Sequence, residues 1–501
     1  MNFLTKENFK SSLIQNFFPK NISEKVFSTQ WINYNFDTIK LLNLRLKSIN
    51  TPCSNFSIYK GETERRILGI PHISTYLILI DCILNKINLI YEKIEKNSSS
   101  TSKNIFLPYD IVYSFEDSLK KRIWDSIGNK YILSLDISRC YENIYTHSIT
   151  WAILGKENAK EEFLKHKDKR SDLYKMADEL DIKIRKINNG ETKGIPTGPI
   201  TSRLISELIL AEIDSILKEK YPNLKYNRYV DDYKFYFVKK EEAIQFIPKF
   251  QKILYDFKFS LNESKTKIDL YPCGIFTEDL RAELGNYDFK KNTVVSFIKK
   301  IMHMHNQGVK GAFKYGIKVL SSQAIEEKDR KYVLAVLLNA LMVFPMNSEV
   351  IITIFEKNEL LSEKNKEQVT DIINRLLSEN IVNDYDEEIF WNLYFLMKFN
   401  LKIDIENILK ILDKQENFTT IMILDYIFKN NYNRSNEEIK EKIVILKEKL
   451  KKQKIYSEEW LLIYECEKNN WIRGLRNIIK SDIFLTKILE ENKGFYISPL
   501  K

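Results

Sequence analysis

The sequence predicts an α+β fold that is followed by an all-α region. Short β-type runs at 131–137 and 227–238 alternate or cluster β-branched and aromatic residues. Apolar residues recur at helical spacing between and after these runs. From about residue 290 the pattern changes to one amphipathic helix after another, and strand-like alternation becomes scarce. We therefore expect a mixed unit first and a helical unit second.

In the first unit, residues 73–96 predict a helix, and the stretch NSSSTS at 97–102 is expected to be a flexible surface loop. Segment 156–193 is rich in charge but has apolar residues at helical spacing, which predicts a helical insertion. Helices are expected at 202–218 and 241–257, on either side of a hairpin that carries Asp231-Asp232 at its tip. The order strand, helix, hairpin, helix matches a split β-α-β core.

The second unit contains successive helical segments separated by Asn, Asp and Ser, at 331–342, 366–377, 388–399, 417–428 and 437–451. Their spacing suits a bundle or an irregular α-solenoid of HEAT-like repeats. The predicted domains are an N-terminal region at 1–130, a central sheet domain at 131–285, and an α-helical repeat domain at 286–501.

Composition narrows the class of protein. An apolar content of 44% in 501 residues is ample for large cores, and a net charge of +10 favours polyanionic partners only weakly. The five cysteines are scattered without CxxC spacing, which fits a reducing compartment and argues against disulfides or a cysteine-bound zinc. The interrupted N-terminus does not resemble a signal peptide, and the apolar runs are shorter than a bilayer span. We expect a cytoplasmic protein without a membrane partner.

Three aspartates stand where metal-dependent chemistry would need them. Asp136 ends a hydrophobic strand, and Asp231 and Asp232 occupy the hairpin tip. Each site alone is more often a turn former or a helix cap. Phosphoryl transfer between nucleotides, however, uses two divalent cations that are held by a few carboxylates. The order of the two aspartate sites along the chain, together with the residues around them, favours a metal-binding role over a turn or a helix cap.

Five motifs in one order resemble those of reverse transcriptases: Lys60 and Arg66 with LGIP at 68–71, LDISRCY at 135–141, GIPTG at 194–198, RYVDD at 228–232 and LNESKT at 261–266. The resemblance implies fingers and palm domains and a catalytic set of Asp136, Asp231 and Asp232. It also implies two Mg²⁺ ions, with Mn²⁺ as an alternative, held by these aspartates and the carbonyl of Ile137.

The same resemblance implies a nucleotide-binding set of Lys60, Arg66, Ile137, Tyr141, Pro196, Thr197, Gly198 and Lys265. Lys60 and Arg66 would grip the triphosphate, and Lys265 would bind or protonate the pyrophosphate. The ring of Tyr141 would leave no room for a 2′-hydroxyl, which implies dNTP substrates and a DNA product. Solvated surface cations, a core tyrosine and a salt-bridged helix-end lysine are the alternatives.

Finer features resemble bacterial abortive-infection (Abi) reverse transcriptases, similar to AbiK: YTHSI at 145–149 with Trp151, Ser202-Arg203 after GIPTG, and Arg65-Arg66 before Pro71 and Tyr76. That resemblance implies antiphage defence, a helical-repeat C-terminal domain, homo-oligomers, and untemplated DNA synthesis from a protein hydroxyl. Thr197 stands where many templated enzymes carry Gln. For priming, Tyr34 and Tyr496 are expected to be reachable candidates. His147 is expected to be a cap or core residue, and His303 and His305 are not expected to bind zinc.

Three hypotheses follow. The first is a defence-associated, protein-primed DNA polymerase that needs no template. The second is a reverse transcriptase that copies a bound non-coding RNA, for which the basic N-terminal half would hold RNA. The third is an idle palm that serves as a scaffold or RNA-binding module, and the intact aspartates speak against it.

Overall fold

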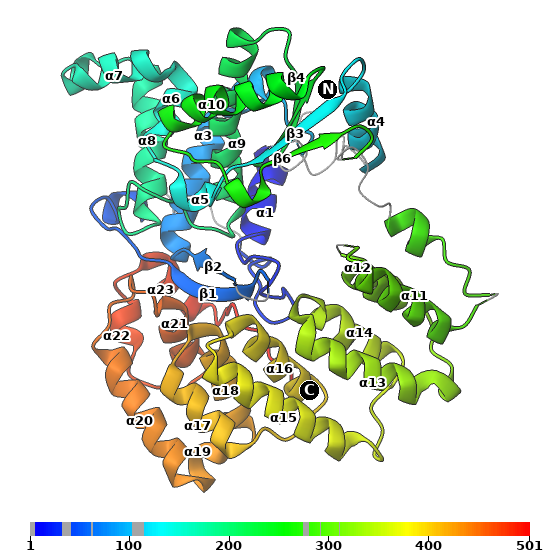
Figure 1. The fold of residues 1–501 in the computed structure, drawn as a ribbon. Helices are drawn as coiled ribbons and strands as arrows, with labels where there is room; N and C mark the ends of the chain where they lie inside the picture. The colour runs from blue at the N-terminus through cyan, green and yellow to red at the C-terminus, as the bar shows by residue number, and fades with distance from the viewer. Residues whose placement is uncertain are drawn as a thin grey trace.

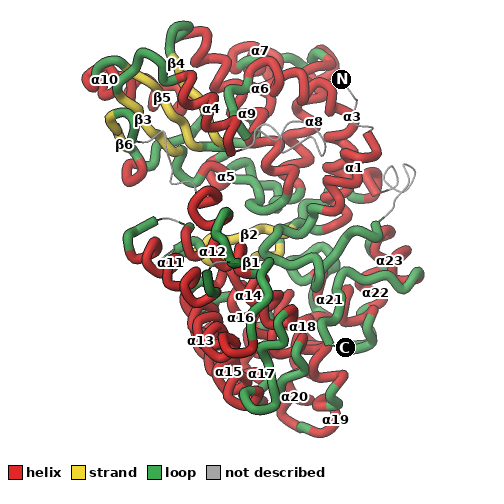
Figure 2. The backbone as a smooth tube through the Cα atoms, turned by 90° about the vertical axis from the view of Figure 1, so that its right-hand side faces the viewer, coloured by secondary structure: helices red, strands yellow, loops and turns green. Residues whose placement is uncertain are grey.

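The computed structural model describes residues 6–32, 42–61, 64–102, 115–273, 280–290, 292–309 and 311–500. Figure 1 shows a mixed α/β unit at the top and a mass of helices at the bottom, with a two-stranded hairpin between them. Figure 2, a quarter-turn away, places the hairpin at the same height between the two parts. The predicted α+β fold followed by a helical region is confirmed.

The upper unit is built on a four-stranded antiparallel sheet in the order β4-β5-β3-β6. Its strands are β3 (Tyr131–Asp136), β4 (Lys225–Tyr229), β5 (Asp232–Phe237) and β6 (Lys267–Leu270). Buried Leu133, Phe235 and Tyr233 face helix α10 (Lys240–Asp256), whose Phe246 and Phe250 pack against the aromatic rings of β5. The predicted strand at 131–137 and the hairpin over 227–238 are confirmed.

Further helices complete the upper unit: α1 (Lys6–Gln15), α3 (Ile73–Asn97), α4 (Phe115–Asp125), α5 (Cys140–Asn143), α6 (Ser148–Leu154), α7 (Lys156–Leu164), α8 (Asp172–Lys186) and α9 (Ile200–Lys220). The insertion at 156–193 is helical as predicted. Among the described residues, α3 alone is long and apolar enough to cross a membrane, contrary to the expectation that the apolar runs are too short. It is instead a core helix that packs on α8 and α9, with 72% of its apolar window buried.

The hairpin between the two parts consists of β1 (Ser54–Tyr59) and β2 (Arg65–Ile70). Its outer strand β1 rests on the first turn of helix α16 (Asp386–Lys398). There the backbone amide of Ser57 donates to Asp386 at 2.9 Å and that of Tyr59 donates to Glu387 at 2.8 Å. These carboxylates satisfy amides on a strand edge that would otherwise be open.

The lower unit is entirely helical within the described residues: α11 (Val294–Asn306), α12 (Ala312–Leu320), α13 (Glu327–Val343), α14 (Ser348–Lys357), α15 (Lys366–Val382), α16, α17 (Ile405–Lys414), α18 (Asn417–Lys429), α19 (Tyr432–Ser435), α20 (Glu437–Lys451), α21 (Trp460–Lys468), α22 (Arg476–Ile479) and α23 (Ile483–Glu490). All five helical segments predicted after residue 290 are present. The HEAT-like character and the domain limits at 130 and 285 stay predictions.

The two units share an aromatic core. Phe27 contacts Phe390 and Phe418 with ring centroids 6.3 and 5.1 Å apart. The last residues of the chain return to this point, where Ser28 N donates to Phe495 O and Ile497 N to Val26 O. The N-terminal region is therefore packed into the helical domain.

The stretch NSSSTS at 97–102 corrects the prediction of a flexible surface loop. Ser98, Ser100 and Thr101 are buried, and Thr101 N donates to Arg228 O at 2.7 Å. The hydroxyl of Ser98 donates to Glu207 at 2.7 Å. A serine-rich composition suits a loop, but here its hydroxyls satisfy buried charged groups instead of water.

Candidate active site

The three aspartates come together at one end of the palm sheet. Strand β3 pairs with β5 so that Asp136 lies directly opposite Asp232, and the β4–β5 turn places Asp231 beside them. One carboxylate oxygen from each lies within 4.8 Å of the other two. Among the described residues this is the only cluster of three groups suited to a metal ion. Antiparallel register, which sequence spacing does not reveal, produces this convergence.

The hairpin tip has a strained backbone that a buried arginine holds in place. Val230 has φ of 56°, a left-handed conformation that is costly for a β-branched residue. Nη1 of Arg228 donates to the carbonyl of Val230 at 2.7 Å. The fully buried guanidinium also pairs with Glu207 at 2.8 Å and Asp214 at 2.7 Å, both on α9. The turn before Asp231 is thus anchored to the helix behind the sheet.

Burial and mutual repulsion raise the pKa values of the paired aspartates. Burial is the largest cause for Asp231, and the charge of Asp136 adds to it. The pKa of Asp232 is raised to about 7 by burial, a hydrogen bond with Asp136 and the charge of Asp231. Clustered carboxylates of this kind are stabilised by a cation, and an all-oxygen donor set suits Mg²⁺ or Mn²⁺. The residues present therefore fit a divalent metal.

Lys265 lies at the same carboxylates. Its Nζ is 3.1 Å from Oδ2 of Asp136, which also accepts from the Asn262 amide at 3.1 Å. Burial would lower the pKa of Lys265, but the hydrogen bond and charge of Asp136 outweigh it and the pKa is raised. The ammonium group stays charged at neutral pH, as binding of a phosphate would require.

Backbone hydrogen bonds join the separate motifs into one site. Gly69 N, in the fingers hairpin, donates to Thr197 O at 2.9 Å. Ile195 N donates to Tyr141 O at 3.0 Å, and Asn262 N donates to Asp136 O at 2.8 Å. Ile137, at the end of β3, is buried and bridges to Leu261. The five motifs are adjacent in space although they span residues 60–266.

Of the predicted nucleotide-binding residues, Lys265 contacts Asp136 directly, and Arg66, Tyr141 and Lys60 have the following surroundings. The Arg66 side chain is exposed on β2, and its positive charge opposes the rise in the pKa of Asp231. The half-buried phenol of Tyr141 has its pKa raised chiefly by burial, with contributions from the charges of Cys140 and Asp231 and an opposing one from Arg203. Lys60, at the hairpin turn, pairs with Glu64 at 2.6 Å.

The GIPTG segment seats the fingers on the palm. Buried Pro196 lies beneath Gly69, where a Cβ on the glycine would be 3.2 Å from the proline Cβ. Gly198 has φ of +124°, and a Cβ there would meet Cγ of Pro19 at 2.7 Å. Thr197 between them is half-buried. Only glycine fits the backbone and the space at 198.

The structure describes one of the two candidates for a priming tyrosine. Tyr34 lies outside the described residues. Tyr496 was expected to be reachable and is not: it is 8% exposed, and its hydroxyl donates to Asp425 at 3.1 Å. The reason is that the C-terminal residues pair with Phe27 as an internal bridge instead of forming a free tail.

His147 occupies the N-cap position of α6, although its side chain makes no capping hydrogen bond, and the expectation for His303 and His305 stays a prediction. His147 precedes α6, and its Nδ1 lies 2.6 Å from the buried carboxylate of Asp181. His303 and His305 lie on α11, away from any group of three potential metal ligands among the described residues.

The sequence motifs do not predict two ion pairs that hold the site in place, those of Arg228 and Arg65. Arg228 was treated only as part of the RYVDD motif, although Glu207 and Asp214, seven residues apart on one helix face, could have indicated a buried partner. Arg65 was noted only beside Arg66. In the structure it forms a bidentate pair with Glu388 of α16 and stacks over Tyr385 at 4.3 Å. Adjacent residues on a strand point to opposite faces, so Arg66 points away from Glu388.

An antiparallel sheet with three convergent carboxylates and a lysine beside them is the arrangement that nucleotidyltransferases of the polymerase type use. Residues 64–309 match the family model described as "Reverse transcriptase (RNA-dependent DNA polymerase)". This part of the chain therefore carries a reverse-transcriptase domain.

Similar solved structures are telomerases of Candida species. Apo telomerase from Candida tropicalis, truncated from its C-terminal domain, has 12% identity and a TM-score of 0.31, over 48% of this chain and 56% of that one. Telomerase from Candida albicans in complex with a fragment of telomeric RNA has 11% identity and a TM-score of 0.31, over 75% and 66%. The chain thus spans between about half and two thirds of these structures. No curated protein sequence matches the chain significantly.

Proposed function

We propose that this protein is a DNA polymerase that adds deoxynucleotides to a hydroxyl group of its primer. The reaction takes place at the site formed by Asp136, Asp231 and Asp232. The observation that carries the proposal is the convergence of these three carboxylates within 4.8 Å at the tip of the palm hairpin. Asp136 and Asp231, supported by Asp232 and the Ile137 carbonyl, would hold two Mg²⁺ ions. Bound there, the ions would activate the attacking hydroxyl and stabilise the leaving pyrophosphate.

The side chains around the aspartates have separate roles in this proposal. Arg66 binds the triphosphate with its fork of donors, and Lys60 adds a point charge once it leaves Glu64. Lys265 neutralises the pyrophosphate, since its ammonium already lies at Asp136. Tyr141 lies near Asp231 and would exclude a 2′-hydroxyl, which favours dNTPs over ribonucleotides.

The polymerase is tested with purified protein, Mg²⁺ and each dNTP in turn, with and without a primer–template. Incorporation that requires Mg²⁺ and disappears in Asp231→Asn supports the proposal. Incorporation that survives this substitution places the chemistry elsewhere and contradicts it. A ribonucleotide arm tests the role of Tyr141, because Tyr141→Ala is expected to relax sugar selection.

The finer function proposed is antiphage defence by a cytoplasmic homo-oligomer that primes DNA synthesis on a protein hydroxyl without a template. Its support is the Abi-like sequence YTHSI with Trp151, Thr197 in the GIPTG segment, and the helical C-terminal domain. A phenol has a pKa near ~10, so a priming tyrosine would need activation at the metal site. Tyr496 in its buried position is not proposed for this role.

Intact mass analysis before and after nuclease treatment tests priming. A ladder of added nucleotides that collapses to one residual nucleotide on a tyrosine supports it. DNA that appears only with an added primer–template contradicts it. Phage plating on cells that express wild type or Asp231→Ala/Asp232→Ala tests the defence role and the idle-scaffold alternative together, since a scaffold would still protect.

A second candidate is templated synthesis on a bound non-coding RNA. The matched family, described as RNA-dependent, favours it. Sequencing of nucleic acid that copurifies with the protein separates the candidates: one defined RNA with its DNA complement supports templated synthesis. DNA of a biased composition without any complementary RNA supports the untemplated reaction.

A further inference from the structure

The C-terminal domain contains a cavity that the polymerase reaction does not use. It has a volume of about 690 Å³ and lies between the end of α18, helices α19 and α20, and the turn after α21. Both views place α19 and α20 at the end of the molecule opposite the palm sheet (Figures 1 and 2). The cavity is therefore separate from the three aspartates.

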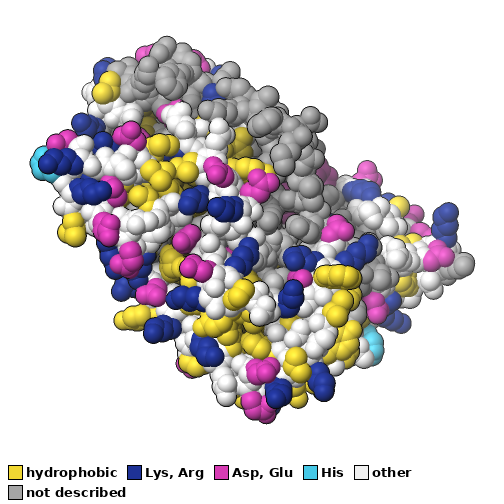
Figure 3. Space-filling model, turned by 90° about the horizontal axis from the view of Figure 1, so that it is seen from above, with side chains coloured by type: hydrophobic (Ala, Val, Ile, Leu, Met, Phe, Trp, Pro, Cys, Tyr) yellow, Lys and Arg dark blue, Asp and Glu magenta, His cyan; other side chains and the backbone are white. Residues whose placement is uncertain are grey.

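Four cations and no carboxylate line this cavity: Arg434, Lys440, Lys447 and Arg473. Lys440 pairs with Glu437 outside the lining at 3.2 Å. The other three form no ion pair with any described residue. Nearby surface lysines do have partners, as with Lys410 and Glu406 at 2.6 Å. On the palm face in Figure 3, basic and acidic side chains are likewise interspersed. The cavity is thus an unusual concentration of one charge.

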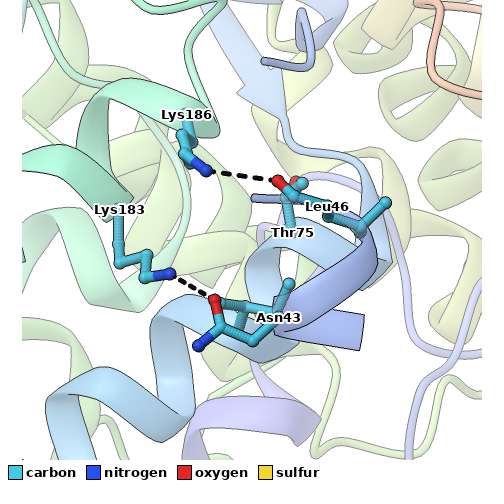
Figure 4. Close-up of a pocket in the computed structure, with 6 residues that line it drawn as sticks. Asn43, Leu46, Thr75, Lys183 and Lys186 are labelled. Carbon is cyan, nitrogen blue, oxygen red and sulfur yellow. Dashed lines mark hydrogen bonds between the residues drawn. The ribbon is translucent and has the colours of Figure 1, made fainter. Parts of the chain in front are cut away.

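In a second cavity of the protein, the lysines form hydrogen bonds with protein atoms, which gives a comparison for the cations above. The small space between Asn43, Thr75 and Lys183 has a volume of about 10 Å³, room for about one water. There Lys183 donates to Asn43 Oδ1, and Lys186 donates to Leu46 O at 3.2 Å (Figure 4). Those ammonium groups link helix α8 to the segment that contains Asn43 and Leu46. Arg434, Lys447 and Arg473 have no such internal partner among the described residues.

The uncharged lining suits a base as well as a phosphate. The side chains of Asn431, Asn433 and Asn470 form no hydrogen bond with described residues, and each offers both a donor and an acceptor. Phe428, Trp471, Ile443 and Val444 supply apolar surface. A cavity of this size falls in the range that encloses small ligands. A simple anion would use the cations but neither the amides nor the apolar wall.

We propose that this cavity binds the phosphate and base of a nucleotide, either free or as part of a single strand. Arg434 and Arg473 would bind phosphate oxygens, and the asparagine amides would contact the base. The site does not depend on the polymerase proposal, because none of its residues lies near the palm.

Binding is tested with the full chain and three probes: fluorescent oligothymidine, dTTP and inorganic phosphate. We expect Arg434→Gln/Arg473→Gln to weaken binding of oligothymidine or dTTP by at least about tenfold, because each substitution removes a charge-assisted hydrogen bond to phosphate. The matched control is Lys410→Gln/Lys442→Gln, which removes two cations that pair with Glu406 and Asp413. It should change binding less than about twofold.

Photocrosslinking of thio-substituted oligothymidine separates this cavity from the palm. Crosslinks in residues 428–473 that disappear in the arginine variant support the proposal. Tighter binding of oligothymidine than dTTP identifies a strand as the occupant, and the reverse identifies a free nucleotide. Crosslinks confined to 64–309, unchanged affinity in the arginine variant, or equal affinity for inorganic phosphate would overturn it. Circular dichroism of both variants confirms that they fold.

Discussion

The guanidinium of Arg228 donates to the carbonyl of Val230 at 2.7 Å, one residue before Asp231. The same guanidinium is fully buried against Glu207 and Asp214. A strained catalytic turn is thereby tied to helix α9, and the position of Asp231 depends on charges that do not belong to the site itself.

Removal of Arg228 is expected to destabilise the protein strongly. Arg228→Ala leaves Glu207 and Asp214 buried without a counter-charge, which costs about 3–5 kcal/mol. Arg228→Met/Glu207→Gln/Asp214→Asn should recover part of this loss in chemical denaturation, because no unpaired charge remains. Its polymerase activity should stay low, since the Val230 carbonyl still lacks its donor. Full activity in the triple variant would contradict the positioning role.

Substitution of the paired aspartates is expected to abolish activity without unfolding the protein. Asp231→Asn/Asp232→Asn removes metal-binding charge worth several kcal/mol, which corresponds to a loss on the order of 10³-fold in kcat. Thermal stability should rise slightly, because burial and repulsion raise both pKa values in the native state. Asp256→Asn, at the C-terminal end of α10, where Lys156 is its partner, is the control and should retain activity. Incorporation assays and melting curves measure both effects.

The neighbouring arginines of β2 are expected to separate binding from stability. Arg66→Ala should raise KM for dNTPs about tenfold with little change in Tm, because Arg66 is exposed and its positive charge acts on Asp231. Arg65→Ala should lower the free energy of unfolding by about 1–3 kcal/mol, because it breaks the pair with Glu388. Steady-state kinetics and denaturation of both variants provide the comparison. An equal effect of the two on KM would show that the faces of β2 are misassigned.

A methyl group at Gly198 is expected to disturb the seat of the fingers. Gly198→Ala forces alanine into a φ of +124° and against Cγ of Pro19. The expected cost is about 1–3 kcal/mol, together with reduced activity. Gly61→Ala in the turn between β1 and β2 is the matched control, since no atom of the described residues lies within 4 Å of its new Cβ. The control should stay within about 0.5 kcal/mol of wild type.

Acid is expected to destabilise the protein through His72. Burial lowers its pKa from 6.5 to about 3, and its Nδ1 accepts from Ser74 N at 3.2 Å. Between these two values the unfolded chain binds a proton that the folded chain does not, so this contribution to stability is lost as pH falls through that window. Between about pH 7.5 and about pH 5, the Tm of His72→Asn should therefore fall by less than the Tm of the wild type.

Asp482 changes the stability in the opposite direction as pH falls, because burial raises its pKa to about 6 and the folded chain then binds the proton more tightly than the unfolded chain. It is present in both proteins, so the difference between them still isolates His72. Equal slopes of Tm against pH would contradict the buried neutral state of His72.

The sequence by itself determined the elements and the chemistry of the site. Local patterns placed strand β3, the β4–β5 hairpin and the later helices, because alternation and helical spacing are properties of neighbouring residues. The motifs around Asp136 and RYVDD identified the aspartates for the same reason: each motif is continuous in the chain.

Only the tertiary structure decided which distant groups meet. The pairing of Asp136 with Asp232, the burial of Ser98 beside Arg228, the enclosure of Tyr496 and the pair of Arg65 with Glu388 all join residues far apart in sequence. When the neighbours of a polar residue in the sequence are polar, local composition predicts that it is exposed. It can nevertheless be buried when a residue from elsewhere in the chain satisfies its hydrogen bonds. Partners of that kind are set by the register of the sheet and the packing of the helices, which local composition does not encode.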